Sequence, residues 1–70
     1  MNDETELAAA EQHVIGAERT VARQRQGVAR WMSEGLETTE AEQTLALYEE
    51  TLKVFRRHRD RILKELGREA

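Results

Sequence analysis

In residues 41–66, mostly apolar residues recur at alternating intervals of four and three. This heptad pattern is typical of a helix that packs against a second helix, and we call the line of recurring residues the seam. The seam residues are Ala41, Leu45, Tyr48, Leu52, Phe55, Arg59, Ile62 and Leu66. Arg59 is the only one of them that is not apolar. The chain contains no proline, so nothing in this stretch interrupts a helix. The pattern therefore predicts one long helix with a narrow apolar seam.

The first half of the chain predicts a second helix with a wider apolar face. One row recurs every seven residues and is flanked on one side by smaller apolar residues and a tryptophan: Leu7, Val14, Val21 and Val28, with Ala10, Ala17 and Trp31. A second row recurs at the same interval beside it: Ala8, Ile15, Ala22, Ala29 and Leu36. A face wider than one seam is expected of a helix that touches more than one partner.

The helix boundaries follow from capping signals, and they predict an all-α single domain over residues 1–70. We expect a first helix over about 4–34, a turn over 35–38 and a second helix over about 39–66. Gly35 suits the left-handed residue that follows a helix. Thr39 with Glu42 matches a capping box, and Thr38 is a competing cap. A connection this short makes the two helices antiparallel neighbours.

A lone hairpin of this size buries little apolar surface, since 70 residues is near the lower limit for independent folding. Pairing of two hairpins into a four-helix bundle is the usual remedy, so we expect a homodimer. Leu47 and Val54 form a short apolar stripe outside the seam, and Ile15 belongs to the wide face of the first helix. These three residues are the candidate outer interface. The alternative is that they are scattered surface apolar residues, which are common.

Charge is distributed in four alternating blocks along the chain. Residues 1–18 hold five acids and no base, residues 19–33 four arginines, residues 34–50 six glutamates, and residues 51–70 seven bases with three acids. When the chain folds back at the turn, acidic blocks lie beside basic ones. Single exposed ion pairs stabilise little, but such a pattern disfavours other orientations and registers.

Arg59 requires a partner if it lies in the seam, because an unpaired buried charge is costly. In an antiparallel hairpin its neighbours on the first helix include Glu11 and Glu18, so we predict a register-setting ion pair of Arg59 with one or both. The alternative is that its aliphatic stem packs in the seam while the guanidinium reaches solvent.

The sequence shows no arrangement of residues typical of catalysis, metal binding or cofactor binding. There is no cysteine, and the four glycines are isolated, which excludes a thiolate nucleophile and a glycine-rich phosphate loop. His13 and His58 lack the Glu-x-x-His spacing of di-iron bundles, although the hairpin brings them within about one turn of each other. We therefore expect no enzyme, no catalytic residue, no metal and no cofactor. Neither a basic signal peptide nor a membrane-spanning run is visible, so we expect a cytoplasmic protein.

Nucleic-acid binding is the alternative function. Rigid helical bundles can recognise RNA or DNA through basic stripes, and six arginines are candidates for contacting a polyanion. They are Arg19, Arg23, Arg30, Arg56, Arg57 and Arg61. The net charge of −3 and the lack of interleaved aromatic residues favour a protein-interaction module instead.

Three segments carry a resemblance to a group of small, uncharacterised proteobacterial helical-hairpin proteins. They are GAERTVARQR (16–25), TTEAEQTLALYEETL (38–52) and HRDRILKEL (58–66). The resemblance implies a bacterial helical hairpin and no particular activity. In architecture alone, the expected dimer also resembles Rop, the plasmid RNA-binding protein built from two helical hairpins.

Overall fold

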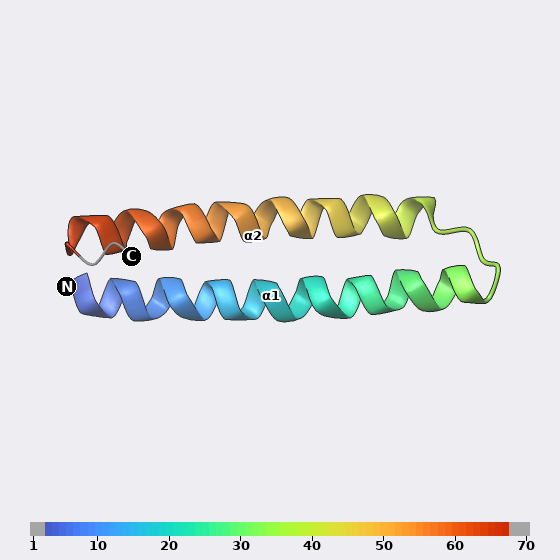
Figure 1. Ribbon diagram of the computed structural model, residues 1–70, viewed down its shortest axis with the longest axis horizontal. Coiled ribbons are helices and arrows are strands. Elements are labelled where there is room, and N and C mark those ends of the chain that lie inside the picture. Colours follow the sequence, from blue (N-terminus) through green and yellow to red (C-terminus); the bar gives the residue numbers. More distant parts are fainter. Residues whose placement is uncertain (1–2, 68–70) are drawn as a thin grey trace.

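Two long helices joined by a short turn form the described part of the chain, residues 3–67, in the computed structural model (Figure 1). Helix α1 spans Asp3–Ser33 and helix α2 spans Thr39–Glu65. They run antiparallel and side by side, and residues 3–67 contain no strand. Each boundary lies within one residue of its predicted position. The all-helical, two-helix architecture is therefore as the heptads predicted.

Gly35 ends α1 in the way the sequence predicted. Its φ of +75° is left-handed, a conformation that costs other residues energy because of their Cβ atom. The Gly35 N–H donates to the carbonyl of Met32 at 3.1 Å, and the Leu36 N–H donates to the carbonyl of Trp31 at 2.9 Å. These two hydrogen bonds are the Schellman motif, which satisfies carbonyls that the helix end leaves unpaired.

The start of α2 differs from the predicted capping box. Thr38 is the N-cap residue, so Thr39 already lies inside the helix and cannot cap it. The Thr38 hydroxyl donates to Glu42 Oε2 at 2.9 Å. Glu37 supplies the missing acceptor, because its Oε1 receives the backbone N–H of Thr39 at 2.7 Å and also the Thr39 hydroxyl. These hydrogen bonds, that from the hydroxyl first, lower the pKa of Glu37 below its ordinary value.

The core lies along the line where the helices face each other. It has one cluster near the open end and one in the middle of the hairpin. The first contains Leu7, Ala10 and Ile62 with Leu63 and Leu66 packed against them. The second contains Val14, Val21 and Leu52 with Ala17, Leu45 and Phe55 packed against them.

Only one of the two apolar rows of α1 enters this core. The row that begins at Leu7 is buried, whereas the row of Ala8, Ile15, Ala22 and Ala29 is exposed. On α2, most predicted seam residues are buried or half-buried, but Tyr48 remains 39% exposed. The apolar face of α1 is thus wider than α2 alone can cover.

The hairpin is long and thin, with extents of 49 × 21 × 14 Å. Within the described part of the chain no side chain is fully buried. Two helices side by side leave two broad faces open to solvent, which we call the flanks. In residues 3–67, the surfaces open to a partner are therefore the flanks, the outer helix surfaces and the two ends.

Candidate interaction surfaces

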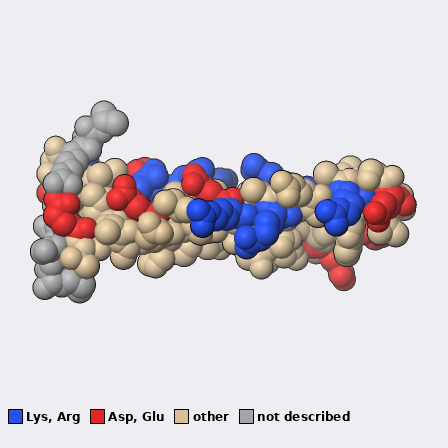
Figure 2. All heavy atoms as spheres, turned by 90° about the horizontal axis from the view of Figure 1, so that it is seen from below, with Lys and Arg blue, Asp and Glu red and all other residues tan. Residues whose placement is uncertain are grey.

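One flank is defined by two ion pairs between the helices, and we call it the charged flank. Arg25 Nη2 lies 2.8 Å from Glu49 Oε2, and Arg56 Nη2 lies 3.1 Å from Glu18 Oε2. The residue numbers of each pair sum to 74, so both pairs report the same register. Figure 2 shows acidic and basic side chains interspersed along one edge of the hairpin, while most of the opposite edge carries neither. This agrees with the antiparallel matching of acidic and basic blocks.

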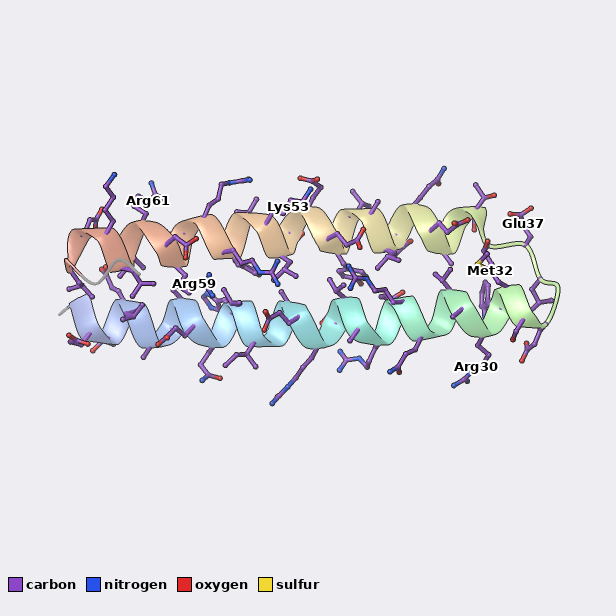
Figure 3. All side chains as sticks on the ribbon, in the orientation of Figure 1. Arg30, Met32, Glu37, Lys53, Arg59 and Arg61 are labelled. Atoms are coloured by element: carbon purple, nitrogen blue, oxygen red, sulfur yellow. The ribbon has the colours of Figure 1, made fainter. Side chains whose placement is uncertain are left out.

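The prediction that Arg59 pairs with Glu11 or Glu18 is wrong. Arg59 Nη2 lies 2.9 Å from Oδ1 of Asp60, the next residue along the chain. Glu18 pairs with Arg56 instead, because Arg56 rather than Arg59 projects onto the charged flank. Arg59 extends between the helices (Figure 3), and its side chain is 29% exposed. Its aliphatic stem therefore packs in the seam while its guanidinium reaches an exposed carboxylate. This arrangement is close to the alternative prediction, in which the guanidinium of Arg59 reaches solvent.

The opposite flank, which we call the uncharged flank, contains an open groove between the helices. Eight residues line the groove: Gln12, His13, Gly16, Ala17, Thr20, Tyr48, Thr51 and Phe55. The Thr20 hydroxyl donates to the Gly16 carbonyl and the Thr51 hydroxyl donates to the Leu47 carbonyl, each at 3.1 Å. Because both hydroxyls are satisfied within their own helices, the two threonines can offer their methyl groups to a partner. The groove is therefore more apolar than its composition suggests.

The two histidines lie at one end of the uncharged flank. The His13 ring packs against Phe55 with ring centroids 5.3 Å apart. His13 and His58 also line a second hollow together with Glu6. An arginine nitrogen, Nη2 of Arg61, lies 3.5 Å from Nδ1 of His58. Among residues 3–67 no group of three or more potential ligands gathers as a metal site requires.

The three residues of the candidate outer interface do not share one surface. Leu47 and Val54 lie one helical turn to either side of Thr51 and so border the groove, where they are 70% and 51% exposed. Ile15 lies one turn from Glu18 and is therefore next to the charged flank. Leu47 and Val54 therefore lie on the groove side of the hairpin, and Ile15 lies on the side of the ion pairs.

The arginines proposed to contact a polyanion fall into three groups. Arg56 is held by Glu18, whereas Arg23 and Arg61 contact Thr20 and His58 respectively. The remaining three, Arg19, Arg30 and Arg57, make no ion pair with the part of the chain that the structure describes. Arg30 and Arg61 point away from the opposite helix in Figure 3. The structure therefore does not gather the six arginines into one basic patch.

Heptad positions explain why sequence reasoning missed the groove. The residues that flank the seam on one side are charged, as in Glu18, Arg25 and Arg56, whereas those on the other side are mostly threonine, glycine and histidine. Comparing the two flanks by heptad position would have revealed this difference. Reading charge in blocks along the chain concealed it, because a block average does not separate the sides of a helix.

No helix in residues 3–67 combines the length and the apolar character that crossing a bilayer demands. Comparison with protein families, with curated proteins and with solved structures finds no match.

Proposed function

We propose that this chain is a small helical interaction protein, an adaptor or regulator, that self-associates into a homodimeric four-helix bundle through its uncharged flank. One observation carries the proposal: the large apolar side chains of Leu47, Val54 and Tyr48 border a groove that no Lys, Arg, Asp or Glu lines. Desolvating such a surface costs little, whereas docking on the charged flank would have to desolvate ion pairs.

The area of the uncharged flank also supports self-association. A flank with principal extents of 49 × 21 Å offers on the order of 1,000 Å² to a partner, against about 800 Å² per partner in a typical stable interface. The described residues of the hairpin include no fully buried side chain. Covering the uncharged flank would therefore bury apolar surface that the hairpin alone leaves exposed, and would stabilise the fold.

Sedimentation velocity at micromolar concentration tests the proposal. We expect twice the monomer mass of 8.1 kDa for the native chain and the monomer mass for Leu47→Glu. Ile15→Glu is the matched control, because it places the same charge beside the charged flank and should leave the dimer intact. A native chain that sediments as a monomer at these concentrations would overturn the proposal.

RNA binding is a second candidate, favoured by one observation: Arg19, Arg30 and Arg57 make no ion pair in the described structure. A gel shift with mixed RNA at low salt tests it, because contacts to phosphates weaken steeply as salt rises. A shift that disappears in the Arg19→Glu, Arg30→Glu double variant would favour RNA binding over a protein partner. If the RNA migrates with the same mobility in the presence and absence of the protein, RNA binding is contradicted.

A further inference from the structure

The uncharged flank contains small residues on α1 and large apolar residues on α2 that could pack against each other between two copies. On α1, Gly16 and Thr20 line the groove, and Gly27 follows Thr20 by one heptad on the same side of the helix. Added Cβ atoms at the two glycines would meet nothing within 4 Å. On α2, Leu47 and Val54 are both more than half exposed. A surface with small residues on one helix and large ones on the other can accept a copy of itself when the two copies pack α1 against α2.

The large and small residues also match in register. Gly27 and Leu47 have numbers that sum to 74, as do Thr20 and Val54, and the two ion pairs of the charged flank obey the same sum. Each large residue of α2 therefore lies at the level of a small residue of α1. A two-fold axis parallel to the helices preserves these levels when it brings the second copy across the flank.

We propose that the occupant of the uncharged flank is a second copy of this chain, related by a two-fold axis parallel to the helices, so that α2 of each copy packs on α1 of the other. Leu47 then lies over Gly27 of the second copy, and Val54 lies over Thr20. This inference rests on the proposed self-association and adds its geometry. Gly27 and Thr20 become the residues that determine specificity, because they leave room for the opposing helix.

Charge agrees with this arrangement. The first 18 residues hold five acids and no base, and they would lie beside the basic final block of the second copy's α2. An inverted dimer, with α1 on α1 and α2 on α2, also matches acid with base, so charge alone does not choose between the two. The sizes of the residues distinguish the two arrangements. In the inverted dimer the large residues would oppose each other and the small residues would oppose each other, which packs less well than large against small.

The same packing accounts for the exposure of Tyr48. It occupies a seam position of α2 and yet is 39% exposed in the hairpin, since it leans toward the groove. In the bundle this position faces the centre of four helices, where an aromatic ring has neighbours on every side.

Engineered cysteines test the geometry cleanly because the chain has none of its own. We would prepare Thr20→Cys and Val54→Cys as separate proteins, mix them, and oxidise the mixture. The expected result is a mixed disulfide dimer that exceeds the homodimeric disulfides of either variant. Ala22→Cys replaces Thr20→Cys in the control, because Ala22 lies on the exposed row beside the charged flank, and we expect no mixed product.

A packing variant supplies a second readout. Gly27→Leu fills the space that Leu47 of the other copy would occupy, and we expect self-association to weaken about tenfold or more. Ala29→Leu adds comparable bulk on the other side of α1 and should leave self-association unchanged.

The outcomes separate the geometry from the proposed function. If the native chain sediments as a dimer but the mixture of Thr20→Cys and Val54→Cys forms mainly the homodimeric disulfide of Val54→Cys, the geometry alone is overturned. A dimer whose self-association is unchanged by Gly27→Leu would also overturn the geometry alone. A native chain that sediments as a monomer would overturn both.

Discussion

Glu18 Oε2 accepts a hydrogen bond from Arg56 Nη2 at 3.1 Å across a separation of 38 residues. Together with the pair between Arg25 and Glu49, it fixes the register in which the helices face each other. Both side chains of the first pair are about half exposed, at 48% and 47%. Their contribution to stability is therefore small, whereas their effect on register is specific.

Reversal of this ion pair tests its role. Arg56→Glu and Glu18→Arg each oppose like charges, and we expect each to lower the free energy of unfolding by about 0.5 kcal/mol. The double variant restores the pair with opposite polarity and should recover most of the loss. Urea denaturation at one fixed protein concentration measures all four proteins, since self-association would otherwise shift the midpoint. Additive losses in the double variant would show that the contact has no energetic consequence.

Arg59→Leu should stabilise the protein. The guanidinium pairs with exposed Asp60, while the stem fills a seam position that leucine would fill completely. We expect a gain of about 1 kcal/mol in the free energy of unfolding, because the apolar seam becomes continuous. Arg57→Leu is the matched control, since Arg57 lies on the exposed surface two residues away and should change little. A loss of stability in Arg59→Leu would mean that the ion pair with Asp60 stabilises the folded protein more than the apolar contacts of a leucine would.

Heptad spacing and capping residues were sufficient to predict both helices, the turn at Gly35 and the antiparallel pairing. These features depend on local preferences and on apolar periodicity, which are visible in one sequence. The sequence left the cap of α2 open between Thr39 and Thr38, and its prediction of the partner of Arg59 was wrong. Thr38 and Thr39 are adjacent in the sequence, and Arg56, which pairs with Glu18, lies less than one helical turn before Arg59. Sequence spacing does not resolve differences of that size.

Gly35→Ala should destabilise the hairpin through the backbone. The left-handed φ of +75° at this position is costly for a residue with a Cβ atom, although the surrounding space is open. We expect a loss of about 1 kcal/mol in the free energy of unfolding, measured by thermal denaturation. Glu34→Ala, one residue earlier and exposed, is the control and should leave the midpoint nearly unchanged. Equal melting curves for Gly35→Ala and the native chain would show that the turn tolerates another conformation.

The carboxylate of Glu37 should make the stability of the protein depend on pH at the start of α2. Its pKa is lowered from the ordinary 4.5 because it accepts the hydroxyl and the backbone N–H of Thr39. A group whose pKa falls on folding stabilises the folded state above its unfolded pKa, and this stabilisation is lost as the pH drops through the folded value. Glu37→Gln cannot ionise, so it should be less stable than the native chain at neutral pH. The difference between the two should narrow once the pH falls below 4.5.

Thermal denaturation of both proteins from neutral pH down to about pH 2 measures this difference, because the range spans both protonation states. Thr39→Val keeps the backbone N–H but removes the hydroxyl, so its pH dependence should lie between those of the other two proteins. Parallel curves for the native chain and Glu37→Gln over the whole range would show that the carboxylate is not held more strongly in the folded state. The start of α2 would then depend on Thr38 and its hydrogen bond to Glu42 alone.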